Sequence, residues 1–153
     1  MIALVFFVII AGTLLMNARL LGIRIPLLIW FEERFERESV LPGWGSACYA
    51  AGTLLLLTFL TDVNEIEAGI FILAIGDGFS TIAGRLGKHR LPHNSGKTWE
   101  GTAAFLLSTL PAYFIAGPAA VAAAVASTLA ESLPGLEDNL TIPIACAFIF
   151  LVL

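Results

Sequence analysis

Six apolar stretches, separated by short polar or charged segments, dominate the pattern of this chain. Each stretch is long enough, or nearly so, to cross about 30 Å of hydrocarbon as an α-helix. The pattern therefore predicts an all-α fold, a polytopic membrane helix bundle that forms a single domain over residues 1–153. The expected spans lie near residues 2–22, 43–60, 66–84, 101–117, 118–134 and 140–153.

The composition supports a membrane protein. Hydrophobic residues make up 58% of the chain and charged residues 13%, and the mean hydropathy is +0.91. A soluble domain carries about a quarter charged residues, so this class is excluded. The first apolar run lacks a basic leader and a small-residue cleavage site, and we expect it to remain as a helix. Cys48 and Cys146 lie in apolar runs without CxxC spacing, which indicates small core residues rather than a disulfide or metal pair.

The positive charges predict an orientation. All 8 basic residues lie at the end of the first predicted span or in the connections that follow the first and third spans. The opposite connections carry only Asp62, Glu65 and Glu67 and a Gly117-Pro118 turn. Because positive charge in short loops stays cytosolic, we expect the amino terminus outside and a functional site facing the cytosol, in the cell membrane or, in a eukaryote, the endoplasmic reticulum. The basic residues are Arg19, Arg24, Arg34, Arg37, Arg85, Lys88, Arg90 and Lys97.

The longest polar connection contains the sequence Gly96-Lys97-Thr98, which matches the end of a nucleotide-binding P-loop. A P-loop also needs a glycine five positions before this element and a strand before the loop. Leu91 occupies that position and no strand is predicted there, so the connection is not a P-loop. His89 and His93 have a metal-like spacing, but Pro92 disturbs a common helical face and argues against a zinc site.

Several carboxylates lie within or beside the predicted spans, where ionisable residues are costly and usually functional. On the predicted topology they all reach the cytosolic side, near Lys97, Arg85 and His93. Such a group would suit a divalent cation that bridges nucleotide phosphates. Two plainer readings stay open: an acid between two glycines can cap a broken helix, and an acid that begins a span can interact with the helix dipole. The first alternative applies to Asp77, which lies between Gly76 and Gly78, and the second applies to Glu100. The other polar residues within or beside the spans are Glu131, Asp138 and Asn139.

Two long stretches carry a resemblance to a known family. The sequence GDGFSTIAGRLGKHRLPHNSGKTWEGTAAF resembles the signature of the polyprenol, phytol and diacylglycerol kinases that use CTP, a group related to the phosphatidate cytidylyltransferases. The sequence ASTLAESLPGLEDNLTIP resembles the second signature of the kinase branch, and Arg37 to Gly45 is a weaker match. The resemblance covers roughly residues 34–145. Family members often have additional amino-terminal spans, so we expect a minimal or an incomplete member.

The resemblance implies a kinase that transfers phosphate from CTP, with Mg²⁺, to the hydroxyl of a membrane lipid alcohol, a polyprenol such as dolichol or a diradylglycerol. No nucleic-acid partner is expected. A cytidylyltransferase that makes a CDP-lipid and a small transporter in which Asp77 relays an ion remain alternatives. The implied catalytic residues are Asp77, Glu100, Glu131 and Asp138, and spacing does not assign the base. The implied metal ligands are Asp77, Glu131 and Asp138, and the implied nucleotide or phosphate contacts are Gly76, Gly78, Arg85, Gly87, Lys97, Thr98 and Asn139.

Overall fold

The computed structural model describes residues 6–7, 10–14, 17–18, 21–23, 26 and 44–153. The predicted span 2–22 is only partly included. The charged segment after it lies almost wholly outside the described residues, as do Arg19, Arg24, Arg34 and Arg37.

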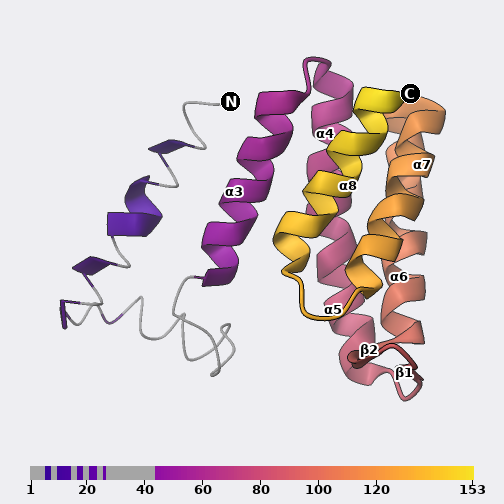
Figure 1. The fold of residues 1–153 in the computed structure, drawn as a ribbon, viewed down its shortest axis with the longest axis horizontal. Helices are drawn as coiled ribbons and strands as arrows, with labels where there is room; N and C mark the ends of the chain where they lie inside the picture. Colours follow the sequence, from indigo (N-terminus) through magenta and orange to yellow (C-terminus); the bar gives the residue numbers. More distant parts are fainter. Residues whose placement is uncertain (1–5, 8–9, 15–16, 19–20, 24–25, 27–43) are drawn as a thin grey trace.

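From Trp44 onward the chain is mostly helical, as predicted, with one two-stranded hairpin that the all-α prediction did not include (Figure 1). The elements are α3 (Trp44–Phe59), α4 (Val63–Phe71), a π-helical turn (Ile72–Gly76), α5 (Asp77–Leu86), β1 (Arg90–Leu91), β2 (Asn94–Thr98), α6 (Trp99–Thr109), a 3-10 turn (Leu110–Ala112), α7 (Tyr113–Ser132) and α8 (Asp138–Val152).

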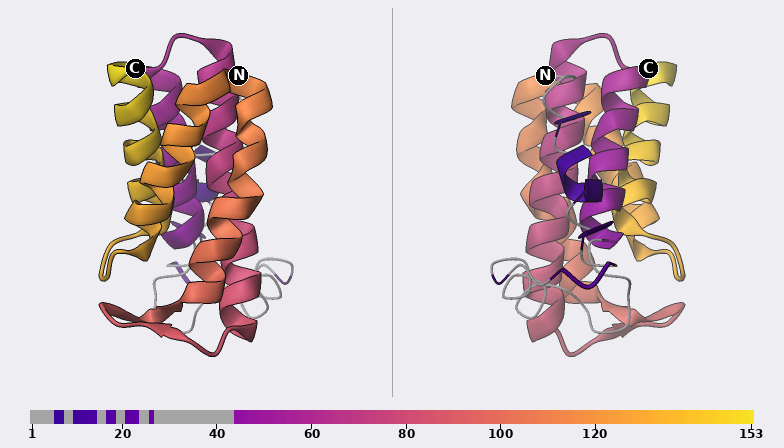
Figure 2. Two further views of the ribbon diagram at one scale, coloured as in Figure 1. Left: turned by 90° about the vertical axis from the view of Figure 1, so that its right-hand side faces the viewer. Right: turned by 90° about the vertical axis from the view of Figure 1, so that its left-hand side faces the viewer.

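The helices form a bundle in which α8 packs against both α3 and α7, and α5 packs against α6 (Figures 1 and 2). The core combines large and small side chains. Leu56, Ile72, Phe105 and Ile142 are fully buried. On α7 three of the six buried residues are alanine and two are serine or threonine, and such small side chains allow the helix backbones to approach closely.

A continuous helical segment runs from α4 through the π-helical turn into α5. It begins at Asp62, whose side chain accepts a hydrogen bond from the Asn64 amide at 2.8 Å. Gly76 and Asp77 both have right-handed helical backbone angles. The alternative in which Asp77 caps a broken helix is therefore wrong. The irregularity before Asp77 is a π turn, a feature that frequently occurs at functional sites.

The chain reverses direction at Gly117, within the segment assigned to α7. Ala116 and Gly117 have non-helical angles, and Gly117 has a φ of 64°, which glycine adopts without strain. Pro118 then begins the returning helix, so that α6 and the main part of α7 lie side by side (Figure 2). This confirms the turn predicted at Gly117-Pro118.

Two helical segments of the described chain are long and apolar enough to cross a membrane, Val63–Leu86 and Trp99–Ser132. The second contains the reversal at Gly117. The helices Trp44–Phe59 and Asp138–Val152 are apolar but shorter. The full set of six spans and the outside position of the amino terminus stay predictions.

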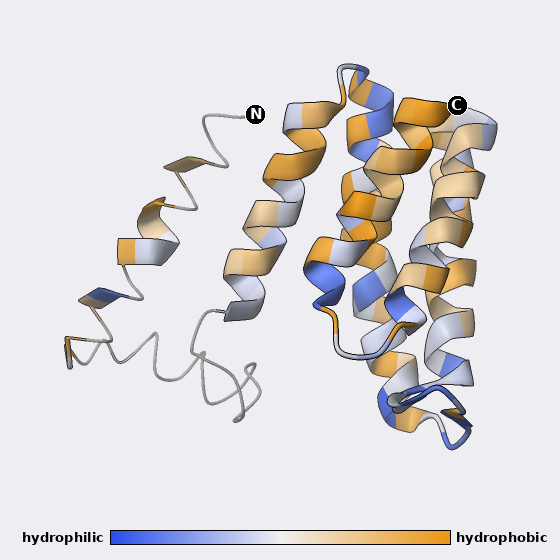
Figure 3. Cartoon of the chain, viewed as in Figure 1, coloured by the Kyte–Doolittle hydropathy of each residue, from blue (hydrophilic) through white to orange (hydrophobic). Residues whose placement is uncertain are grey.

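The outer surface of the bundle is also apolar. Phe114, Leu107 and Phe148 are 87%, 67% and 64% exposed. Hydrophilic residues concentrate in the β1–β2 hairpin, at the adjoining ends of α7 and α8, and at the beginning of α4 (Figure 3). Apolar surface between two polar ends indicates an association with a membrane.

Candidate functional site

The β1–β2 hairpin closes one end of the bundle and carries Lys97 (Figure 1). Its strands pair antiparallel, with Arg90 opposite Thr98 and Leu91 opposite Asn94. The Asn94 side chain donates hydrogen bonds to the carbonyl oxygens of Ser132 and Leu133, at 3.1 and 3.2 Å. The last carbonyls of a helix lack partners within the helix, so these bonds stabilise the end of α7 and fix the hairpin against it.

Lys97 connects the ends of two helices. Its Nζ donates to Glu131 Oε1 in the last turn of α7 and to Asp138 Oδ2 at the first residue of α8, each at 2.6 Å. The second oxygen of Glu131, Oε2, lies 3.5 Å from the Thr102 hydroxyl on α6. We call Lys97, Glu131 and Asp138 the Lys97 cluster. The structure thus brings together three residues that the sequence analysis singled out.

The Lys97 cluster is largely shielded from solvent. Glu131 is 1% exposed, and the side chains of Lys97 and Asp138 are 23% and 19% exposed. Burial alone would lower the pKa of Lys97, but the carboxylates of Asp138 and Glu131 raise it above its usual value, so the ammonium is charged at neutral pH. A buried carboxylate requires such a partner, because an uncompensated buried charge is strongly destabilising.

Asp77 is the first residue of α5. It is half-buried and within electrostatic range of Asp138 on α8 and of Tyr49 on α3. Asp77 therefore acts electrostatically on Asp138, whereas the Lys97 ammonium contacts Glu131 and Asp138 directly.

Glu100 is engaged elsewhere. Its carboxylate accepts hydrogen bonds from the backbone amides of Lys88 and His89, at 3.0 and 3.3 Å, and lies 2.7 Å from His89 Nδ1. These contacts tie the first turn of α6 to the connection between α5 and β1. The structure therefore places Glu100 as an anchor of this connection, and its hydrogen-bond partners are not members of the Lys97 cluster.

Thr98 and two of the predicted phosphate-contacting glycines have structural partners. Thr98 is buried, and its hydroxyl caps α6 by accepting from the Gly101 amide at 3.1 Å. A Cβ at Gly76 would meet the Phe105 ring at 2.6 Å, and one at Gly87 would meet Thr98 Oγ1 at 2.7 Å. Gly78 differs, since a Cβ there would meet nothing within 4 Å. Gly76 and Gly87 thus serve close packing against α6, whereas Gly78 faces open space beside Asp77.

The remaining predicted contacts are Asn139 and Arg85. Asn139 donates from Nδ2 to the Gly45 carbonyl at 3.3 Å, which ties α8 to α3. Its Oδ1 is buried and has no hydrogen-bond partner in the described part of the chain. Arg85 is exposed in the last turn of α5.

Among the described residues, no three His, Cys, Asp or Glu side chains lie close enough together to hold a metal ion by themselves. Mg²⁺ is commonly held by only one or two carboxylates together with water and substrate phosphates. The Lys97 cluster fits that mode, because Glu131 and Asp138 already share one cation, the Lys97 ammonium, between them. Their anionic oxygens are the ligand type that Mg²⁺ favours.

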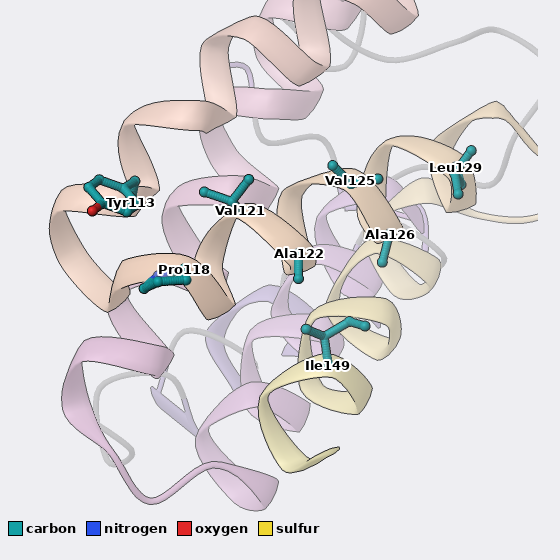
Figure 4. Close-up of a pocket in the computed structure, with 8 residues that line it drawn as sticks. All are labelled: Tyr113, Pro118, Val121, Ala122, Val125, Ala126, Leu129 and Ile149. Atoms are coloured by element: carbon teal, nitrogen blue, oxygen red, sulfur yellow. The ribbon is translucent and has the colours of Figure 1, made fainter. Parts of the chain in front are cut away.

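A hollow of about 670 Å³ lies on the outer face of α7 and is lined by apolar side chains (Figure 4). Its lining includes Val121, Val125 and Leu129 of α7 and Ile149 of α8. Glu131 is two residues beyond Leu129, about 200° further around the helix, and so faces the opposite side. The hollow has no charged group to perform chemistry, and the candidate site is the Lys97 cluster.

Thr102 and Asn94 were not predicted as site residues. Thr102 follows Lys97 by five positions, and its proximity to Glu131 arises from the packing of α6 against α7. Asn94 binds carbonyls that lie 38 and 39 positions further along the chain. Neither contact could be predicted from the neighbouring sequence, because the partners lie far apart in the chain.

Comparison with known proteins supports part of the family resemblance. No protein-family model matches the chain, and no solved structure matches it. The chain is 33% identical over 124 residues to a probable chloroplastic phytol kinase of Triticum aestivum, an alignment that covers 65% of this chain and 41% of that protein. The chain is similar to a phytol kinase. This similarity agrees with the predicted resemblance to lipid kinases. It does not test the predicted resemblance to dolichol kinases or the relation to cytidylyltransferases.

A second relative has no described function. The chain is 34% identical over 118 residues to an uncharacterized protein of Methanocaldococcus jannaschii, covering 74% of this chain and 60% of that protein. The chain thus spans less than two thirds of the length of both relatives.

Proposed function

We propose that this chain transfers a phosphoryl group from a nucleoside triphosphate, CTP, to the hydroxyl of a membrane lipid alcohol at the cytosolic end of the bundle. The observation that carries the proposal is the Lys97 cluster, with Asp77 in electrostatic range, at one end of an apolar helical bundle. The similarity to a probable phytol kinase supports the acceptor class, a long-chain alcohol.

Phosphoryl transfer needs mainly positioning and neutralisation of charge. The lipid hydroxyl oxygen bonds to the γ-phosphorus, and the bond from that phosphorus to the β–γ bridging oxygen breaks, which releases CDP. The hydroxyl proton passes to a carboxylate among Asp77, Glu131 and Asp138. Lys97 neutralises phosphate oxygens, and the apolar bundle keeps the lipid chain in the bilayer with its hydroxyl at the interface.

In this proposal Glu131 and Asp138 would hold Mg²⁺ together with the nucleotide phosphates, and Asp77, in electrostatic range of Asp138, would add negative charge nearby. When bound, Mg²⁺ would neutralise charge on the nucleotide phosphates. Gly78 leaves space beside Asp77 for the nucleotide. The anchoring of the hairpin by Asn94 and of its connection by Glu100 keeps Lys97 in position.

The experiment is a screen of CTP, ATP, GTP and UTP against phytol, a polyprenol and a diacylglycerol. The full chain is reconstituted in lipid nanodiscs, and both products are identified by mass. The proposal expects a nucleoside diphosphate and a lipid monophosphate in equal amounts, with CTP the best donor. Formation of pyrophosphate and a CDP-lipid would instead establish a cytidylyltransferase activity. Absence of turnover with every pair of nucleotide and lipid would reject the proposed enzymatic function.

A further inference from the structure

One ammonium occupies the space between two carboxylates that converge from different helices. Lys97 Nζ lies 2.6 Å from Glu131 Oε1 and 2.6 Å from Asp138 Oδ2. Asp77 adds a further negative charge within electrostatic range of Asp138. In this arrangement the lysine that would contact phosphate is already paired with the two carboxylates that would hold a cation.

We propose that the Lys97 ammonium holds the position of the divalent cation between Glu131 and Asp138, and that entry of the cation releases Lys97 to the nucleotide phosphate. This exchange rests on the proposed function, because it assigns both ligands to that site. A divalent cation and an ammonium compete for the same anionic oxygens, and hard cations favour such oxygens strongly. The displaced ammonium then needs another anion, and a phosphate oxygen provides one.

The fold allows this exchange with little movement of the backbone. Asn94, on the same strand as Lys97, is fixed by hydrogen bonds to the carbonyls of Ser132 and Leu133. Glu131 retains a contact to Thr102 through its second oxygen. The lysine side chain has a flexible four-carbon stem and is partly exposed, so its rotation alone can move the charge.

The exchange makes cation binding and phosphate binding cooperative. Without nucleotide, the cation must displace Lys97, which weakens its binding. Without the cation, Lys97 is held by Glu131 and Asp138, which weakens phosphate binding. Each ligand therefore increases the affinity for the other by the same factor. A lysine that only ties α7 to α8 would produce no such coupling.

The first test measures Mn²⁺ binding to the full chain without nucleotide, from the electron paramagnetic resonance signal of free Mn²⁺. Lys97→Met removes the competing charge and should bind Mn²⁺ about tenfold more tightly than the wild type, or better, since a neighbouring charge at a partly buried site has an effect of this order. The matched control is Lys88→Met, because Lys88 is exposed beside the same hairpin. Its Mn²⁺ affinity should equal that of the wild type. Equal or weaker Mn²⁺ binding by a folded Lys97→Met protein would overturn the exchange.

A second test uses the wild-type chain and does not depend on the folding of a variant. An amine-acetylating reagent is applied with and without Mn²⁺, and modification of each lysine is quantified by peptide mass spectrometry. Mn²⁺ should increase modification of Lys97 several-fold, a nonhydrolysable CTP analogue added with Mn²⁺ should suppress it, and Lys88 should not change. Modification of Lys97 that is unaffected by Mn²⁺ would refute the exchange.

The tests of the exchange can succeed or fail independently of the test of the proposed kinase activity. Increased modification of Lys97 with Mn²⁺ supports the exchange even in a protein that phosphorylates none of the tested lipids. Lipid phosphorylation without any effect of Mn²⁺ on Lys97 leaves the kinase standing and rejects the exchange alone.

Discussion

The crossing of α3 and α8 leaves no room for a side chain at Gly52. A Cβ at this position would overlap the Asn139 carbonyl oxygen and would lie 2.7 Å from Pro143 Cγ. Pro143 has no N–H and so cannot donate the usual helical hydrogen bond to the Asn139 carbonyl. At this contact the backbone of α3 lies directly against the backbone of α8. The first residue of α8 is Asp138, a member of the Lys97 cluster.

Gly52→Ala requires the two helices to separate by about 1 Å, because overpacked cores relieve such contacts by backbone shifts. Overpacking lowers the free energy of unfolding by about 1–3 kcal/mol. We expect a loss at the upper end of this range, because the Asn139 carbonyl oxygen belongs to the backbone and cannot rotate away. Alanine has a better helix propensity than glycine, and this offsets about 1 kcal/mol of the loss. The net loss of about 2 kcal/mol corresponds to a fall in Tm of about 4–8 °C for a chain of this size.

The same shift moves Asp138 relative to Lys97, where the present distance is 2.6 Å. Misplacement of a catalytic group by about 1 Å can lower the rate up to about 100-fold. We therefore expect lipid phosphorylation by Gly52→Ala to fall well below that of the wild type at temperatures where both proteins are folded.

The assay is thermal unfolding in detergent, followed by tryptophan fluorescence, together with the product assay described above. The matched control is Gly45→Ala, at the beginning of the same helix, where a Cβ would meet nothing within 4 Å. This control should keep or slightly raise the wild-type Tm. A Gly52→Ala protein with wild-type Tm and turnover would show that the reasoning about the α3–α8 crossing is wrong.

Three further predictions concern individual residues. Asp77→Asn should keep a nearly native Tm but lose lipid phosphorylation and the Mg²⁺ dependence of nucleotide binding, measured by calorimetry; near-normal turnover would remove Asp77 from the metal site. Glu100→Ala should increase hydrogen exchange at the amides of Lys88 and His89, measured by mass spectrometry, and reduce turnover less than Asp77→Asn; loss of turnover with unchanged exchange would instead indicate a direct catalytic role. Single substitutions His89→Cys and Asn64→Cys should be labelled by a membrane-impermeant reagent from the cytosolic and the outer side respectively, and labelling of both from one side would contradict the predicted topology.

The apolar runs determine the helices, because a backbone in an apolar environment must satisfy its own hydrogen bonds. The reversal at Gly117 could likewise be predicted, since glycine and proline act locally on the backbone. The β1–β2 hairpin could not. Its strands are short and polar, and the hairpin is stabilised by docking onto the end of α7, which lies far away in the sequence.

The π turn before Asp77 was equally invisible, because Ile72–Gly76 has the composition of an ordinary apolar helix. The predicted topology placed the candidate acids on one side near Lys97, but it did not say which of them contact the lysine. Lys97 pairs with Glu131 and Asp138 across 34 and 41 positions, while Glu100, three positions away, binds Lys88 and His89 in the connection between α5 and β1. Local sequence therefore determined where helices form and where acids occur. Which acids meet Lys97 was decided by the packing of α6, α7 and α8, because only long-range burial brings their ends together.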